Sequence, residues 1–398
     1  MTEGRRRPTR AEIDLAAVRH NAALLRRLVA PAALCAVLKA DAYGHGAPAV
    51  AQAAIEGGAD RVAVALVDEG IELREAGVSV PILVLSEPAA DAVADAVAAR
   101  LTPTLYTEGL RARVEAAARA SGAPQPVQLK VDTGMHRVGA APGALGVLAR
   151  AVVDSGALSL EAIWTHLAVA DGGAEEDRAF TAHQLAQFDA VVQELAAAGI
   201  DPPLRHAANT AGAVAWPASR YDLVRCGLAL YGELPSTTVA DAFAAASGGE
   251  ALAPVLTLRS EVVAVRSLPA GARPSYGRRR PLPGPSTVAT VPIGYADGVP
   301  FALFEAGGEV LIGGRRHPLA GQVTMDQLVV DCGADSAVRP GDEVVLIGRQ
   351  GDERVTATEW ATRTRTISYE ILSRIGPRVP RVLSRPPGAD PSGRSRGP

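Results

Sequence analysis

Lys39 stands at the end of an apolar run and directly before a polar, glycine-containing turn. The run from Leu34 to Leu38 has the length of a buried parallel strand. An amine at the mouth of an apolar pocket loses solvation in its charged form, so its pKa falls and it becomes available as a nucleophile or proton acceptor. A lysine that only reaches from a strand end to water would have the same local sequence. Tyr43 follows four residues later, and we expect its hydroxyl to point toward the same mouth.

A second group of residue types favours the binding of a phosphate. Asn209 and Thr210 can cap a helix that starts near Ala211, which would leave its first N–H groups free for an anion. Gly227 would let a ligand approach the backbone closely. Taken alone, an Asn-Thr pair before a helix indicates no more than a cap. With Lys39 across the same pocket, the pattern predicts a cofactor that carries a phosphate.

The elements that must position these residues alternate between short apolar runs and alanine-rich segments of helical period. Eight strands are expected, at Leu34 to Leu38, Arg61 to Leu66, Ile82 to Leu85, Leu101 to Leu105, Val127 to Val131, Leu158 to Thr165, Leu204 to Ala207 and Leu223 to Cys226. This alternation is typical of a (β/α)8 TIM-like barrel, in which the loops after strands seven and eight often seat a phosphate. A doubly wound open sheet would also alternate, but no GxGxxG follows the first strand. We predict an α/β fold with a barrel domain over residues 11–235.

The character of the sequence changes after Gly232. A linker is expected over Ser236 to Gly249, followed by segments rich in valine and threonine. The strands expected there are Val255 to Val265, Thr287 to Ile293, Glu309 to Ile312, Gln327 to Cys332 and Glu343 to Ile347, with one helical stretch near Thr356 to Arg363. We predict a mainly β C-terminal domain over residues 250–384, which residues 1–15 can join through a strand at Glu12 to Leu15, and a disordered tail over residues 385–398.

Composition narrows the class of function. The net charge of -3 and pI near 6.2 give no pull toward nucleic acid or anionic membranes, so a small-molecule substrate is favoured. The N-terminus lacks an apolar signal region, and no segment has the length of a membrane span, so we expect a cytoplasmic protein. The seven histidines and three cysteines show no metal-ligand spacing, and no metal is expected.

Several motifs resemble those of the alanine racemase family, which are fold-type III pyridoxal-phosphate enzymes. VLKADAYGHG around Lys39 is similar to the family's cofactor attachment segment, and KVDTGMHRVG, WTHLAVAD, HAANTAG and LVRCGLALYG are similar to its other barrel motifs. PSYG, IGYADG, GQVTMDQ and TISYE resemble its C-terminal motifs. The resemblance covers essentially Ala11 to Leu383. It departs from the family pattern at Thr210 and Thr324, where serine and cysteine are usual.

The resemblance implies pyridoxal 5'-phosphate as the cofactor and alanine as the substrate. It implies that Lys39 anchors the cofactor and that Arg137 and Met325 bind the substrate carboxylate. Lys130 is implied to hold Arg137 in place, either carbamylated, as is frequent in the family, or through a plain salt bridge. The further cofactor contacts that the resemblance implies are Tyr43, His166, Asn209, Thr210, Arg225, Gly227, Leu228 and Tyr369, with His206, Tyr295 and Asp326 in supporting positions.

Arg225 separates the possible chemistries. A guanidinium keeps its proton, so set against the pyridine nitrogen it would hydrogen-bond that nitrogen without protonating it, which weakens the ring as an electron sink. Such a site suits an enzyme that only removes and returns one proton. A related decarboxylase is expected to place a carboxylate there, and a non-catalytic pyridoxal-phosphate carrier would lack the β domain. A structural arginine in a buried ion pair is the alternative without chemistry.

Racemisation needs an acid/base group on each face of Cα, which one lysine in a fixed position supplies poorly. Tyr276 in the PSYG motif matches the family's second base, with His166 as its orienting partner. The resemblance implies that Tyr276, Tyr295 and Met325 serve the pocket of a partner subunit, so a homodimer with shared active sites is expected. The function implied is interconversion of L-alanine and D-alanine by two bases, supplying D-alanine for peptidoglycan.

Overall fold

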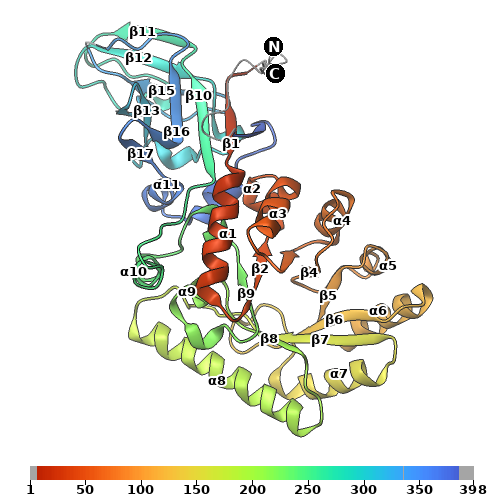
Figure 1. Cartoon of the computed structure of the whole chain (residues 1–398). Coiled ribbons are helices and arrows are strands. Elements are labelled where there is room, and N and C mark those ends of the chain that lie inside the picture. Colours follow the sequence, from red (N-terminus) through yellow and green to blue (C-terminus); the bar gives the residue numbers. More distant parts are fainter. Residues whose placement is uncertain (1–6, 335, 385–398) are drawn as a thin grey trace, which may run out of the picture. The chain divides into compact units, whose positions relative to one another are not determined.

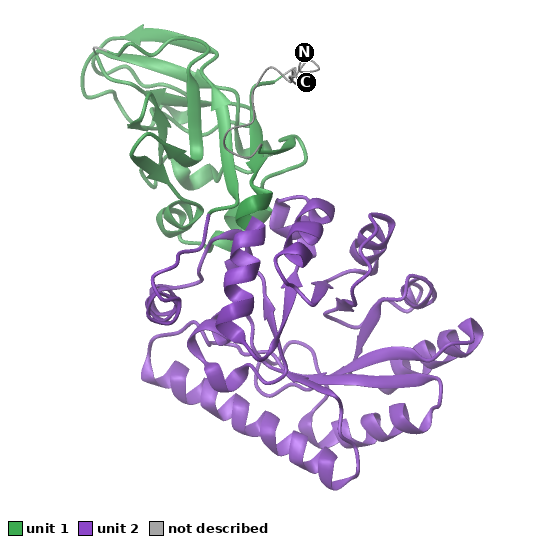
Figure 2. Cartoon of the chain, in the orientation of Figure 1, with its two compact units in different colours: residues 1–17, 254–398 green, residues 18–253 purple. Residues whose placement is uncertain are grey.

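The computed structural model describes residues 7–334 and 336–384. The chain forms two compact units (Figure 2). Unit 2 is Val18–Ala253, and unit 1 combines the N-terminal segment Met1–Ala17 with Pro254–Pro398. The tail predicted over residues 385–398 lies outside the described residues. Among the helices in the described part of the chain, none has both the length and the apolar composition needed to span a membrane.

Unit 2 is a nearly closed barrel of eight parallel strands. These are β2 (Ala33–Val37), β3 (Arg61–Val64), β4 (Ile82–Val84), β5 (Thr102–Leu105), β6 (Gln125–Lys130), β7 (Leu158–Trp164), β8 (Leu204–His206) and β9 (Leu223–Cys226). The order is β8-β7-β6-β5-β4-β3-β2-β9. Between β8 and β9 the backbone N–H of Asp222 donates to the carbonyl of Arg205 at 3.1 Å, and that of Arg225 to Ala208 at 3.0 Å. The predicted barrel and the positions of its eight strands are confirmed.

Helices surround these strands within unit 2 (Figure 1). They are α1 (Leu15–Val29, which crosses from unit 1), α2 (Lys39–Gly44), α3 (Ala47–Glu56), α4 (Val67–Glu75), α5 (Val93–Ala98), α6 (Glu108–Ser121), α7 (Pro142–Asp154), α8 (Glu175–Ala197), α9 (Thr210–Ala215) and α10 (Thr237–Ala246), with 3₁₀ turns η1 (Pro217–Ser219) and η2 (Leu228–Tyr231). Leu129 of β6 packs in one buried cluster with Leu145 of α7 and Phe188 of α8. The apolar side chains that recur at helical spacing in the sequence therefore cover the outer face of the barrel strands.

The predicted linker over Ser236 to Gly249 is wrong in its central part, which forms α10. The Ser236 hydroxyl accepts a hydrogen bond from the N–H of Val239 at 3.3 Å and so caps the helix. Val239 and Phe243 are buried in a cluster with residues of α8 and α9. Two large apolar residues four positions apart give this alanine-rich stretch a face to bury, which decides for helix over linker.

Unit 1 is mainly β. Its strands are β1 (Arg10–Ile13), β10 (Leu256–Glu261), β11 (Ala264–Leu268), β12 (Ser286–Val291), β13 (Glu309–Ile312), β14 (Arg315–Pro318), β15 (Leu328–Asp331), β16 (Glu343–Gln350), β17 (Glu353–Val355) and β18 (Arg381–Leu383). Its short helical elements are α11 (Ala357–Thr364), α12 (Ser368–Ser373), η3 (Tyr276–Arg278), η4 (Tyr295–Asp297) and η5 (Phe301–Leu303). One sheet has the order β14-β13-β16-β10-β1-β18, with β17 on β16, and the other has the order β11-β12-β15.

The N-terminal strand belongs to unit 1, because β1 pairs antiparallel with β10 and parallel with β18. It ends before Asp14, whose carboxylate accepts hydrogen bonds from the N–H groups of Ala16 and Ala17 at 2.8 and 3.0 Å and so starts α1. The single strand expected over Val255 to Val265 is wrong, because this stretch contributes to β10 and β11, which lie in different sheets. A second helix, α12, was not predicted.

Candidate active site

Lys39 lies two residues after the end of β2 and begins a left-handed turn, labelled α2. The four residues after it have φ between 52° and 55°, a region that costs L-residues roughly 1–2 kcal/mol each. Two carboxylates hold this turn. The Glu69 carboxylate, from outside the turn, accepts from the N–H of Ala40 at 2.6 Å, and the Asp41 carboxylate, within the turn, accepts from the N–H of Ala47 at 2.7 Å. The backbone is thus fixed where Lys39 leaves the strand.

Basic side chains gather at this end of the barrel. Burial and the nearby Arg137 lower the pKa of Lys39, which Glu69 partly offsets. Lys130, the last residue of β6, is only 3% exposed, and burial, Arg225 and Arg137 lower its pKa to about 7. These groups therefore lie close enough to act on one another, and the excess positive charge suits a ligand with several negative charges.

Arg225 on β9 is buried and bound by neutral acceptors. Its guanidinium donates to Nδ1 of His206 at 2.6 Å, to Nδ1 of His166 at 3.2 Å and to the carbonyls of Thr165 and Ala207, each at 2.9 Å. Burial, followed by the charge of Arg225, holds the pKa of both histidines well below the usual value. Within residues 7–334 and 336–384, no carboxylate forms an ion pair with Arg225, so a buried structural ion pair does not account for this arginine.

Trp164, the last residue of β7, forms the apolar wall beside these cations. The Lys130 amine lies 4.5 Å from the centre of the Trp164 ring system, and the Arg225 guanidinium lies 4.6 Å from it. The ring of His206 stacks on Trp164 with centroids 5.5 Å apart and planes inclined by 10°. Cation–π attraction offsets part of the cost of burying these basic groups.

Tyr43, Thr210 and Gly227 meet just after the ends of β2, β8 and β9. The backbone N–H of Gly227 donates to the Thr210 hydroxyl at 3.1 Å, and a β-carbon at Gly227 would collide with the Tyr43 hydroxyl. The Tyr43 ring lies 4.8 Å from that of Tyr231, whose hydroxyl donates to the carbonyl of Val37 at 2.8 Å. The missing side chain at Gly227 thus lets two hydroxyl groups and backbone converge, as a phosphate site requires.

Asn209 and Leu228 flank this cluster. The Asn209 side chain accepts from the N–H of Gly212 at 3.0 Å, so the predicted cap of α9 is present. Leu228 is buried and begins η2, directly after Gly227. The barrel therefore gathers the predicted residues of unit 2, which are Lys39, Tyr43, Lys130, Arg137, His166, His206, Asn209, Thr210, Arg225, Gly227 and Leu228.

Unit 1 carries the other predicted residues. Tyr276 begins η3, and Ser275 before it donates from its hydroxyl to the carbonyl of Gln322 at 2.6 Å. A β-carbon at Gly321 would clash with the backbone of Pro274. The Tyr276 segment is therefore packed against the segment that leads to Met325.

The Met325 and Tyr295 segments are joined in the same way. The N–H of Tyr295 donates to the carbonyl of Thr324 at 2.9 Å, and that of Ala296 to Met325 at 3.1 Å. A β-carbon at Gly294 would collide with these carbonyls. The side chains nevertheless point outward.

Tyr276, Met325 and Tyr295 are 75%, 52% and 42% exposed. Unit 1 thus presents three predicted site residues that it does not itself bury.

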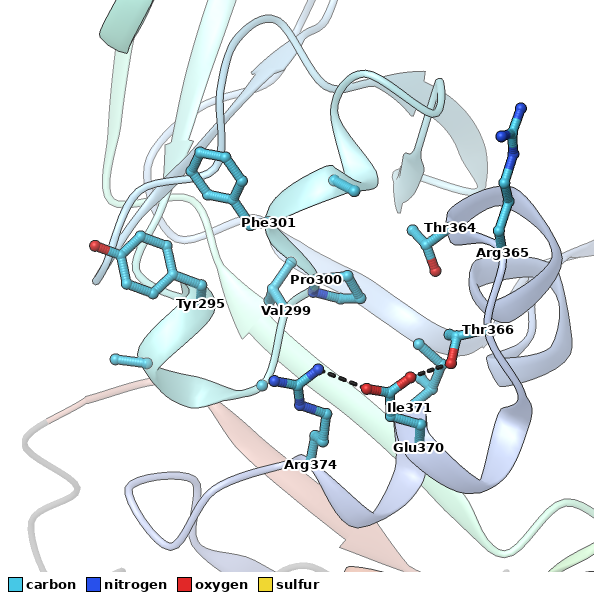
Figure 3. A pocket seen from close by; sticks show the side chains of 13 residues that line it. Tyr295, Val299, Pro300, Phe301, Thr364, Arg365, Thr366, Glu370, Ile371 and Arg374 are labelled. Atoms are coloured by element: carbon cyan, nitrogen blue, oxygen red, sulfur yellow. Dashed lines mark hydrogen bonds and ion pairs between the residues drawn. The ribbon is translucent and has the colours of Figure 1, made fainter.

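Two predicted residues complete this part of unit 1. The Asp326 carboxylate forms an ion pair with Arg378 at 2.7 Å, and Tyr369 lies on α12. A pocket of about 730 Å³ lies beside α12 (Figure 3). Tyr295 is its one lining residue among those predicted for the site, and Glu370 forms an ion pair with Arg374 within it.

Sequence reasoning missed several residues that hold the site together. Glu69 supports the turn after Lys39, the Trp164 ring contacts the buried basic groups, and Gln128 contacts His206 at 3.0 Å. The WTHLAVAD motif contained Trp164, but Glu69 and Gln128 lie in no recognised motif. Their roles depend on contacts between different strands and helices, which local sequence does not show.

The fold and the site together define a barrel enzyme with a second, mainly β domain, whose polar residues follow the strands of the barrel. Residues 13–235 match the family model described as alanine racemase, N-terminal domain, and residues 255–383 match that described as alanine racemase, C-terminal domain. The chain belongs to the alanine racemase family. The family resemblance of the sequence motifs is thereby confirmed.

Individual relatives agree over nearly the whole chain. The alanine racemase of Symbiobacterium thermophilum is 45% identical over 375 residues, covering 94% of this chain and 97% of the relative. The solved alanine racemase of the D-cycloserine producing Streptomyces lavendulae has a TM-score of 0.88 and 37% identity, covering 96% of this chain and 98% of that one. The alanine racemase of Bacillus anthracis with bound L-Ala-P has a TM-score of 0.87 and 33% identity, covering 96% of each chain.

Proposed function

We propose that the protein is a pyridoxal-phosphate-dependent alanine racemase that interconverts L-alanine and D-alanine and supplies D-alanine for peptidoglycan. The observation that carries this proposal is the cationic barrel mouth, where Lys39, Lys130, Arg137 and Arg225 influence one another while Arg225 has only neutral partners among the described residues. A ligand with a phosphate and a carboxylate would neutralise such a mouth.

The residues present fit pyridoxal phosphate. The sequence contains only two lysines, Lys39 and Lys130, so there are two candidates for attachment of the cofactor through a lysine side chain. Lys39 is the better one because it follows a strand end beside the Tyr43 and Gly227 cluster. The residues that would hold the cofactor are Lys39, Tyr43, His166, Asn209, Thr210, Arg225, Gly227, Leu228 and Tyr369.

When bound, pyridoxal phosphate supplies an electron-withdrawing ring that acidifies the α-hydrogen of an attached amino acid. Lys39 would take up or return the proton on the D-isomer side, and the lowered pKa of its amine favours that role. Tyr276 would do so on the L-isomer side. The Arg137 guanidinium and the Met325 backbone N–H would hold the substrate carboxylate.

Arg225 favours racemisation over decarboxylation or transamination. Because its neighbours His206 and His166 are neutral, its proton has no base strong enough to take it, although burial lowers its pKa to about 10. A donor that keeps its proton leaves the ring a weak electron sink, so the α-carbon is reprotonated rather than carried into other reactions.

A homodimer would complete the site. Tyr276, Tyr295 and Met325 are exposed in a single chain although each would act in a water-excluded pocket. A neighbouring chain that presents these residues to the barrel mouth would bury them and bring the second base to the face opposite Lys39.

The test is a chiral-chromatography assay of the purified, cofactor-loaded protein. Each enantiomer of alanine should be converted to an equimolar mixture of both, with no carbon dioxide released. Release of carbon dioxide without the opposite enantiomer would assign a decarboxylase instead, and absence of any turnover would reject the proposal. Parallel reactions with other amino acids measure the substrate range.

A further inference from the structure

A chain of hydrogen bonds crosses the inside of the barrel from Arg61 to Arg225. Arg61, the first residue of β3, donates to Glu161 of β7 at 2.6 Å, and Gln128 of β6 donates to the other carboxylate oxygen at 2.8 Å. The carbonyl oxygen of Gln128 lies 3.0 Å from Nε2 of His206, whose Nδ1 lies 2.6 Å from Arg225. Five residues from five different strands are thus linked in one line.

The donors and acceptors of this line fit together in one direction. The Glu161 carboxylate can only accept, so the amide nitrogen of Gln128 must face it and the amide oxygen must face His206. His206 must then carry its proton on Nε2. From the other end, Arg225 can only donate, which requires a free lone pair on Nδ1 of His206. With every hydrogen bond in place, both ends favour the same imidazole tautomer.

Burial makes this constraint strict. Gln128 and His206 are fully buried, and Arg225 is 3% exposed. A reversed amide would place two N–H groups against each other and two oxygen acceptors against each other in a dry interior, which costs more than one hydrogen bond. Trp164 stacks on the imidazole and fixes its plane. The neutral state of His206 agrees, because burial and Arg225 keep its pKa well below the usual value.

We propose that Gln128 and Glu161 are positioning residues that select the Nε2–H tautomer of His206 and thereby hold the Arg225 guanidinium in the orientation in which it meets the cofactor ring. The consequence for catalysis rests on the proposed racemase function. The assignment of the tautomer does not rest on that function, because it follows from the hydrogen bonds between the five residues alone. Arg61 acts at the far end by holding the Glu161 carboxylate in place through their ion pair.

The tautomer can be measured directly. In holoenzyme labelled with ¹⁵N-histidine, long-range ¹H–¹⁵N correlation distinguishes protonated from unprotonated ring nitrogens, and loss of one signal set in His206→Asn assigns His206 among the seven histidines. We expect a single wild-type state with Nε2 protonated and Nδ1 unprotonated. Gln128→Met removes the acceptor of the Nε2–H group, so part of the population should shift to the Nδ1–H tautomer, with the Arg225 guanidinium turned from Nδ1 toward its carbonyl acceptors. It should also lower kcat on the order of tenfold with little change in KM for alanine, because Arg225 faces the ring rather than the substrate carboxylate.

Matched variants separate selection from a general loss of packing. Gln125→Met changes another buried glutamine of β6. Gln125 donates to the Leu101 carbonyl and takes no part in the line of hydrogen bonds from Arg61 to Arg225, so this variant should leave the tautomer and kcat unchanged. Gln128→Glu should restore the wild-type tautomer, because a buried carboxyl beside Glu161 stays protonated, donates to Glu161 and accepts from His206.

Glu161→Gln, on a partly exposed side chain, provides a second break if Gln128→Met does not fold. Its amide can donate as well as accept, so Gln128 can turn its N–H groups toward His206. Part of the population should then carry the proton on Nδ1, with Arg225 turned toward its carbonyl acceptors. The proposal fails if wild-type His206 is protonated on Nδ1, or if the breaking variant keeps a pure Nε2–H state. A protein without racemase activity but with the expected tautomers would reject the proposed function and leave this inference intact.

Discussion

Arg225 on β9 lies in parallel register with Cys35 on β2. Cys35 precedes Lys39 by four residues in the sequence. The strand that leads to Lys39 and the strand that carries Arg225 are therefore neighbours, although 186 positions separate the two residues in the sequence. This pairing closes one side of the barrel mouth. It explains how a lysine and an arginine from opposite ends of the barrel sequence lie at the same barrel mouth, where both would contact the proposed cofactor.

Reduction of the holoenzyme with borohydride should fix the cofactor on Lys39. The sequence has only one other lysine, Lys130, so the reduced cofactor can be attached to one of two lysines. We expect peptide mass mapping to find the added mass on the peptide that contains Lys39. Lys39→Ala should lose the cofactor absorbance band and the label, whereas Lys130→Met should retain both. Label on Lys130 in the wild type would overturn the assignment.

Gly227→Ala should weaken cofactor binding at least tenfold, because the added methyl group would collide with the Tyr43 hydroxyl at the proposed phosphate seat. Kd for pyridoxal phosphate, measured by fluorescence titration of the apoenzyme, tests this. Gly146→Ala on α7 is the matched control, since nothing lies within 4 Å of the added atom. Equal affinities in the two variants would show that Gly227 does not border the cofactor.

Lys130 should form a carbamate, because its pKa of about 7 leaves much of the amine neutral near pH 7. The neutral nitrogen bonds to the carbon of carbon dioxide and releases one proton. Since the folded-state pKa is below the ordinary lysine value, protonation protects the amine only below about pH 7, and the carbamate should increase as pH rises through that value.

¹³C NMR in labelled bicarbonate tests this expectation. A carbamate resonance should appear in the wild type and in Lys39→Ala and be absent from Lys130→Met. A carbamate would place a negative charge near Arg137 and Arg225, so activity of carbon dioxide-depleted enzyme should fall. An unchanged spectrum across the variants would leave Lys130 as a plain amine.

The order of the elements could be predicted from sequence because each barrel strand is a short apolar run bounded by turns. The candidate site residues lie in local motifs, so their positions could be named as well. Glu161 and Gln128 could not be found in this way. They are 33 positions apart in the sequence and meet only because β6 and β7 are paired, so their hydrogen bond depends on strand register. The same limit hid Glu69, which supports a turn 29 positions earlier.

Tyr276→Phe should slow removal of the α-proton from L-alanine far more than from D-alanine, on the order of a hundredfold against little change. The reason is that phenylalanine keeps the ring but loses the group that would exchange a proton on that face. Exchange of the α-hydrogen in deuterated water, followed by NMR for each enantiomer, measures both rates. Equal slowing would contradict two bases on opposite faces.

Mixing two inactive variants should restore activity if the site is shared between chains. Lys39→Ala lacks one base and Tyr276→Phe lacks the other, so each homodimer should be inactive toward racemisation. In a mixed dimer, one site would combine the intact barrel of one chain with the intact Tyr276 segment of the other, while the second site would carry both defects. After dissociation and reassociation of equal amounts, half of the dimers are mixed and half of their sites are intact, giving about a quarter of the wild-type rate. Sites contained within one chain would give no recovery, because neither chain supplies both groups.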